Sequence, residues 1–195
     1  MSKNTLATEI LSWIKSIGIA FALALLINLF IFEMTGVDGE SMHPTLEHGD
    51  RLFAVKINQV FKQVPKYDSI VIVDANVRRE RTLLDEIKDS AIVSTILRRQ
   101  NRDILIKRVI GVPGDVIEFR DNRVYRNGEL LEEEYILEEM IMVDRTITVP
   151  EDHVFVMGDN RNNSRDSRSI GPIPLKNVRG KVVIRLFPFN KISLL

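Results

Sequence analysis

The sequence feature that most constrains the fold is an uncharged apolar run near the N-terminus. Seventeen consecutive residues, Ser16–Phe32, carry no charged side chain. As an α-helix, at about 1.5 Å per residue, this run would be roughly 26 Å long, near the lower limit for crossing a bilayer. A cleaved secretory signal and a buried core helix are the alternatives. No Ala-x-Ala site follows the run, and it is apolar on every side, so we predict an uncleaved transmembrane anchor over residues 16–34.

Charges on the two sides of this run predict its orientation. Lys3 and Lys15 precede it together with the amino terminus, whereas Glu33, Asp38 and Glu40 follow it. Because basic residues favour the cytoplasmic side, we expect residues 1–15 in the cytoplasm. Residues 35–195 would then form an extracytoplasmic domain attached to the cell membrane by a single pass.

Composition excludes several classes of protein. The 195 residues include 27 Lys and Arg and 27 Asp and Glu, so the formal net charge is zero, and there is no cysteine. A general nucleic-acid binder needs a surplus of basic residues, so we expect no nucleic-acid partner. The absence of cysteine excludes a disulfide scaffold, thiol catalysis and thiolate metal sites.

After residue 50 the sequence consists of short runs rich in Val, Ile and Phe, separated by turn residues. The predicted strands are Arg51–Lys56, Ser69–Asp74, Ile104–Ile110, Val116–Arg120, Arg123–Arg126, Thr146–Val149, His153–Met157 and Lys181–Leu186. Asn127-Gly128 between two such runs is typical of a type I′ hairpin turn. We therefore predict a mostly β fold, with a partly closed antiparallel sheet as its main domain.

One segment, Val77–Asp103, departs from this pattern. Its apolar residues recur close to a helical period and its two ends are basic, which predicts an inserted amphipathic helix. This helix could pack its apolar face on the sheet, or it could contact a membrane surface or a substrate. The sequence leaves both interpretations open.

Three polar motifs contain the candidate functional residues. They are Gly39–Leu46 (GESMHPTL), Lys107–Asp115 (KRVIGVPGD) and Gly158–Arg168 (GDNRNNSRDSR). Each alone could be an ordinary polar turn.

Lys107 is an unusual residue for its strand. Strand alternation puts it on one face with Leu105 and Val109, and the opposite face is also mainly apolar. Burial disfavours the ammonium form and lowers the pKa of a lysine, and a neutral lysine is a competent general base. A serine nucleophile needs such a base. Because no histidine stands in a recognisable triad pattern and the Gly-x-Ser-x-Gly turn is absent, a Ser/Lys pair is the chemistry that this pattern favours.

Taken together, the three motifs resemble those of bacterial type I signal peptidase (leader peptidase), a membrane-bound Ser/Lys protease. The Ser-Met-x-Pro-Thr-Leu, Lys-Arg-x-x-Gly-x-Pro-Gly-Asp and Gly-Asp-Asn-x-x-x-Ser-x-Asp-Ser-Arg patterns occur in the order found in that family. With the apolar run, the resemblance extends from about Ile14 to Phe189, apart from the Val77–Asp103 segment.

The resemblance implies a role for each matching residue. Ser41 corresponds to the nucleophile, Lys107 to the general base, and Ser164 to a hydroxyl that orients the lysine amine. The remaining matches are structural ion pairs: Asp159 with Arg108, and Asp166 with Arg168. Gly39 stands where some relatives have an oxyanion-hole serine, as in the Gram-positive-type enzymes, so the oxyanion would rely on backbone N–H groups, including that of Ser41.

The implied function is removal of N-terminal signal peptides from exported preproteins, with small residues before the cleavage site. The implied partners are the preprotein and the lipid bilayer; no cofactor and no metal are expected, and the oligomeric state is left open. A different Ser/Lys hydrolase, such as a self-cleaving repressor, and a non-catalytic membrane-tethered binding domain are the alternatives.

Four further features have simpler interpretations. His43 and His48 lack a third ligand in a recognisable metal-binding pattern. The acidic run Glu132–Glu134 is expected to be a solvated face, as are Glu138 and Glu139. Met42 and Phe53 could line shallow substrate pockets, touch lipid, or pack in the core.

Overall fold

The computed structural model describes residues 3–56, 63–82, 84–85 and 103–195, and within the N-terminal helix it describes the side chains of residues 8–24. Most of the regular structure is β-strand. In chain order the elements are α1 (Lys3–Phe30), β1 (Phe32–Gly36), β2 (Arg51–Val55), β3 (Ile70–Asp74), β4 (Ile104–Gly111), β5 (Val116–Arg120), β6 (Arg123–Arg126), β7 (Glu129–Leu130), β8 (Arg145–Thr148), β9 (His153–Met157), α5 (Ser167–Ile170), β10 (Ile173–Pro174), η1 (Leu175–Asn177), β11 (Val178–Phe187), η2 (Phe189–Lys191) and β12 (Ser193–Leu194).

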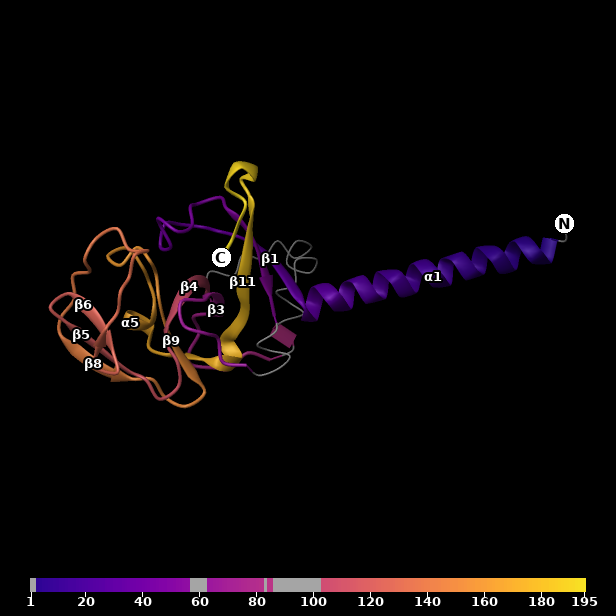
Figure 1. Cartoon of the computed structure of the whole chain (residues 1–195). Helices are drawn as coiled ribbons and strands as arrows, with labels where there is room; N and C mark the ends of the chain where they lie inside the picture. Colours follow the sequence, from indigo (N-terminus) through magenta and orange to yellow (C-terminus); the bar gives the residue numbers. More distant parts are fainter. Residues whose placement is uncertain (1–2, 57–62, 83, 86–102) are drawn as a thin grey trace.

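The described strands form two antiparallel sheets. The larger has eight strands in the order β1-β2-β11-β3-β4-β9-β10, with β12 paired to β11, and the smaller has four in the order β7-β6-β5-β8. The prediction of a mostly β, antiparallel fold is therefore confirmed, but two sheets replace the single one expected. Figure 1 shows the smaller sheet at the end of the β-domain that lies away from α1.

Apolar side chains cover both faces of the centre of the large sheet. On β3, Ile70 and Ile72 belong to one core cluster, and the alternating Val71 and Val73 belong to another on the opposite face. This explains why β3 is apolar at consecutive positions rather than at alternate ones. A third cluster, which includes Phe119 and Phe155, joins the small sheet to the large one.

The Asn127-Gly128 turn has the predicted geometry. Both residues have positive φ, 55° and 83°, as a type I′ turn requires, and Arg126 pairs with Glu129 across it. The turn between β5 and β6 uses Asp121 and Asn122 in the same way, with φ of 51° and 59°.

The N-terminal helix α1 extends away from the β-domain (Figure 1). The predicted span of residues 16–34 is wrong at its end, because the helix stops at Phe30 and β1 begins at Phe32. β1 pairs with β2 throughout, and Glu33 forms an ion pair of 2.7 Å with the buried Arg179 of β11. Residues 32–34 therefore belong to the sheet.

Within the described part of the chain, no helix combines the length and the hydropathy needed to cross a bilayer.

The predicted inserted helix is also corrected at its start. Residues 77–82 form a turn followed by irregular chain, while Leu84 and Asp85 are helical. The buried Arg81 contacts Asp74 at 2.7 Å, so the segment folds back onto the end of β3. Residue 83 and residues 86–102 lie outside the described residues, and the rest of the predicted helix falls there.

Candidate functional site

Strand pairing brings the three polar motifs together. The first motif lies in the connection between β1 and β2, Lys107 and Arg108 lie in β4, and the third motif follows β9 directly. β4 pairs with β9 so that Arg108 is opposite Met157, the residue before the third motif. The Asn160 N–H of the third motif then donates to Ser41 O at 3.1 Å, which fixes the first motif against the third.

Lys107 contacts the hydroxyl of Ser41. The Lys107 Nζ atom lies 2.6 Å from Ser41 Oγ and donates a second hydrogen bond to Ile106 O at 2.8 Å. Lys107 is 2% exposed, although a lysine is rarely buried so fully. At this separation the Ser41 proton can pass to the amine whenever the amine is neutral.

Burial lowers the pKa of Lys107 from its ordinary 10.5 to about 8. The main cause is desolvation, which disfavours the charged ammonium. The nearby carboxylates of Asp166 and Asp159 act in the opposite direction, while the guanidinium of Arg168 adds to the lowering. The net result is an amine that is partly neutral near physiological pH.

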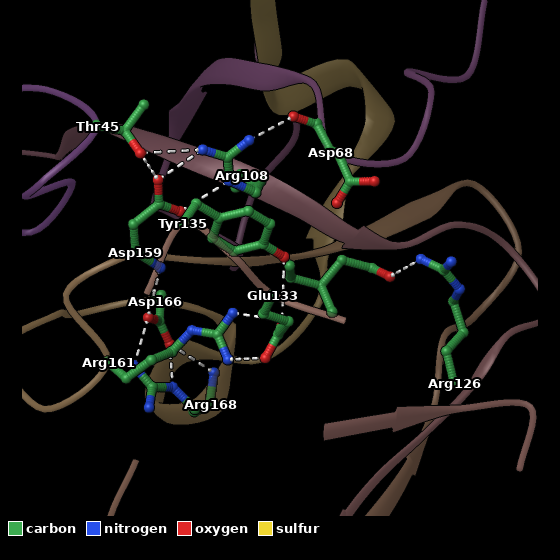
Figure 2. A network of polar contacts seen from close by, with 12 residues as sticks. Thr45, Asp68, Arg108, Arg126, Glu133, Tyr135, Asp159, Arg161, Asp166 and Arg168 are labelled. Carbon is green, nitrogen blue, oxygen red and sulfur yellow. Dashed lines mark hydrogen bonds and ion pairs between the residues drawn. The ribbon is translucent and has the colours of Figure 1, made fainter. Parts of the chain in front are cut away.

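Asp159 and Arg108 form a two-bonded ion pair beside this amine. Arg108 Nε donates to Asp159 Oδ1 at 2.8 Å, and its Nη2 donates to Oδ2 at 2.6 Å. Thr45, a residue of the first motif to which we assigned no role, donates its hydroxyl to the same carboxylate and accepts from Arg108 at 3.2 Å. One ion pair thus joins all three motifs (Figure 2).

Asp166 and Arg168 form the second ion pair. Arg168 Nε and Nη2 donate to the two carboxylate oxygens at 2.9 and 2.8 Å, and the Gly158 N–H donates to Oδ2 at 2.9 Å. Burial alone would raise the pKa of Asp166, but the Arg168 guanidinium and the Gly158 amide hold that pKa below its usual value. Asp166 also caps α5 by accepting from the Arg168 N–H.

Ser164 lies near the pair but does not contact the lysine amine through a hydrogen bond. Its Oγ atom is buried and makes no hydrogen bond of good geometry among the described residues, but it lies close enough to Asp166 to help lower the pKa of that carboxyl. A Cβ placed on Gly158 would lie 2.3 Å from this Oγ and 2.4 Å from Ser41 O. Gly158 therefore allows Ser164 and Ser41 to approach the same point of the backbone.

In the predicted oxyanion region, the Gly39 amide is already hydrogen-bonded to a side chain. Gly39 has a φ of +95°, which favours glycine, and its N–H donates to His48 Nδ1 at 3.2 Å. Among the described residues, the Ser41 N–H makes no hydrogen bond. The Ser41 amide is therefore the free donor nearest to the nucleophile.

Two side chains near the site, Glu133 and Tyr135, were misread or missed from the sequence. Glu133, expected on a solvated face, has a side chain only 6% exposed and pairs with Arg161 of the third motif. Tyr135 stacks on Arg108, with the Arg108 Cζ atom 3.9 Å from the ring centroid. No local pattern marks either residue, because their partners are distant in sequence.

Burial bears on the expectations for two apolar side chains of the site region, Met42 and Phe53. Met42 is 1% exposed and belongs to the core, so it does not line a surface pocket. Phe53 is half-buried, with its ring centroid 5.0 Å from that of Phe32.

In the described part of the chain, no group of three His, Asp or Glu side chains could hold a metal ion.

The comparisons with known proteins show the family to which the chain belongs. Residues 10–187 match the family described as "Signal peptidase, peptidase S26", so the chain belongs to that family. It is similar to signal peptidase I of Bacillus licheniformis, with 37% identity over 94% of this chain and 92% of the relative. It is also similar to the probable signal peptidase I-1 of Synechocystis, with 37% identity over 89% of this chain and 80% of the relative. The protein is an enzyme of the signal peptidase I type.

Two further similarities cover a smaller share of one of the two chains compared. The thylakoidal processing peptidase 1 of Arabidopsis thaliana is 34% identical over 92% of this chain, which spans 49% of that relative. A crystal structure of a signal peptidase I from Enterococcus faecalis is 28% identical, with a TM-score of 0.45 over 61% of this chain and 97% of that one.

We predict that Gly158→Ala lowers kcat/KM by about 100-fold, because the added methyl group would push against Ser41 O and Ser164 Oγ and displace Ser41 from Lys107. Gly111→Ala is the matched control. Its Cβ would lie 2.9 Å from Ile117 Cδ1, a flexible side-chain atom, so it should lower the thermal stability without disturbing Ser41. Equal activity of the two purified, folded variants would contradict this account of Gly158.

Proposed function

We propose that this enzyme removes signal peptides from preproteins by hydrolysing one peptide bond with a Ser/Lys dyad. Ser41 Oγ attacks the carbonyl carbon while Lys107 Nζ takes the hydroxyl proton. The oxyanion accepts a hydrogen bond from the Ser41 N–H. Lys107 then gives its proton to the leaving amine, and it activates the water that hydrolyses the acyl-enzyme. Family membership supports the activity.

The observation that supports the dyad most directly is the 2.6 Å contact between Lys107 Nζ and Ser41 Oγ in a buried setting. A lysine in a merely binding domain would be expected at the surface, where its charge is solvated. The two ion pairs around it support the same role, because each carboxylate near the amine has its own arginine.

We further propose a role for Ser164 in this reaction. Its buried Oγ lies beside the same point of the backbone as Ser41 O, at Gly158, and its proposed role is to orient the lysine amine during turnover. Cleavage after small residues is the specificity that we propose for the substrate.

The test of the proposed function uses the detergent-solubilised full chain and a preprotein whose signal ends in Ala-x-Ala. We expect Ser41→Ala and Lys107→Ala each to lose processing by at least about 1,000-fold, because neither half of the pair works without the other. Lys191→Ala, a control at an exposed surface ion pair, should retain activity. Processing that survives either dyad substitution would refute the mechanism.

We predict that kcat/KM rises with pH through an apparent pKa of about 8. Below that pKa Lys107 is protonated and cannot accept the Ser41 proton; at pH 7 about one tenth of the molecules are neutral, and at pH 9 about nine tenths. The measurement is kcat/KM on a short fluorogenic peptide from pH 6 to 10. A rate that continued to rise beyond pH 10 would mean that Lys107 keeps its ordinary pKa, and a flat profile would point to another base.

We also propose that α1 attaches the enzyme to the cell membrane, with residues 1–15 in the cytoplasm and the β-domain outside. The support is the exposure of the large apolar side chains in its described part, which would be unfavourable in water. They are Ile10, Leu11, Trp13, Ile14, Ile17, Ile19, Phe21 and Leu23, each at least half exposed.

This attachment predicts that the full chain stays with membranes after extraction at alkaline pH, whereas a chain beginning at residue 31 is released. In intact spheroplasts, added protease should digest the β-domain. Release of the full chain by the extraction would contradict attachment through α1, and protection of the β-domain would contradict the orientation.

A further inference from the structure

The connection between β7 and β8 returns to the ion pair beside the dyad. From this connection, Tyr135 places its ring against Arg108, whose Cζ atom is 3.9 Å from the ring centroid. The guanidinium of Arg161 approaches the same ring, at 5.8 Å. Figure 2 shows the Tyr135 ring between these two arginines. A connection between two strands of the small sheet thus contributes a side chain to a cluster built from β4 and the third motif.

The tyrosine is itself held in place. Its hydroxyl donates to Glu133 Oε1 at 3.0 Å, and the Glu133 carboxylate accepts two hydrogen bonds from Arg161. The side chains of Glu133 and Arg161 are 6% and 1% exposed. A buried ion pair of this kind has little freedom to move, so it fixes the position of the ring.

The ring completes the surroundings of Arg108. The edge of the Arg108 guanidinium is bonded to Asp159, to Thr45 Oγ1 and, through Nη1, to Asp68 O at 2.9 Å. The Tyr135 ring covers a face of that guanidinium, where water would otherwise compete for Asp159.

We propose that Tyr135 is a positioning residue for the reaction: its ring keeps Arg108 on Asp159, so that the charge of this carboxylate stays neutralised beside Lys107. This inference rests on the proposed Ser/Lys mechanism. Without the ring, Asp159 is left more exposed to the lysine, and its negative charge stabilises the ammonium form.

Other charged groups also surround Lys107 and Tyr135. Asp166 and Arg168 from the third motif also act on Lys107, and they pair with each other. Glu133, Arg161, Arg108 and Asp68 are the charged groups that act on or contact Tyr135. Of these, only Arg108 is hydrogen-bonded to Asp159, one of the two carboxylates that act on Lys107. Substitution of Tyr135 therefore reaches the dyad through the Arg108–Asp159 pair.

The experiment compares Tyr135→Leu and Tyr135→Phe with the wild-type full chain in detergent, using kcat/KM on a short peptide from pH 6 to 10. Tyr135→Leu removes the ring and should move the midpoint of the pH profile upward by about 0.5 unit, lowering kcat/KM at pH 7 by about threefold. Tyr135→Phe keeps the ring and should leave the midpoint in place, although it loses the bond to Glu133.

The matched control is Tyr125→Leu. Tyr125 stacks on Arg120 at 4.1 Å in the small sheet, and it makes no described contact with Arg108 or Asp159. Its loss should leave the pH midpoint unchanged. Thermal unfolding of each variant identifies the folded ones, and Tyr135→Met, which keeps apolar volume without a π face, replaces Tyr135→Leu if that variant unfolds.

An unchanged midpoint in the folded Tyr135→Leu or Tyr135→Met variant would overturn the proposal, whatever its rate. A shift in Tyr135→Phe as large as that in Tyr135→Leu would also overturn it, because the hydroxyl and not the ring would then be responsible. Failure of the Ser/Lys mechanism itself is seen separately, as the absence of any pH transition in the wild-type enzyme.

Discussion

A lysine amine held out of water, 2.6 Å from a serine hydroxyl, is the constraint on which the rest of this structure depends. Lowering the pKa of Lys107 from 10.5 to about 8 costs about 3 kcal/mol of folding stability at neutral pH. Because the folded state binds fewer protons than the unfolded chain between these two values, the cost is full below pH 8 and disappears as the pH rises toward 10.5. The apolar clusters on both faces of the large sheet provide folding stability that offsets this cost of burying Lys107.

The ionic surroundings of the amine follow from the same constraint. Carboxylates near a buried amine would restore its charge, yet Asp159 and Asp166 both lie close enough to raise the pKa of Lys107. Each carries its own arginine through two hydrogen bonds, so most of its charge is already compensated. The two pairs can therefore join the motifs firmly while burial still determines the protonation of Lys107.

How much of this could be predicted from the sequence depends on the range of each interaction. Strand alternation identified the buried position of Lys107, and turn chemistry identified the Asn127-Gly128 hairpin, because both are local properties. The boundary between α1 and β1 could not be predicted, because Phe32 is apolar enough for either element and its pairing partner is Val55. Glu133 was misread for a similar reason: a run of three glutamates indicates a solvated face, and only the fold brings one of them to Arg161.

The central claim is most directly tested by titrating the Lys107 amine itself. In full-length Ser41→Ala protein with isotopically labelled lysine, the Lys107 side-chain NMR signal, assigned by its loss in Lys107→Arg, is followed from pH 6 to 11. A midpoint near 8 is the result that this account predicts. A midpoint near 10.5, in line with the surface lysines, would show that the amine remains charged at neutral pH and cannot be the base.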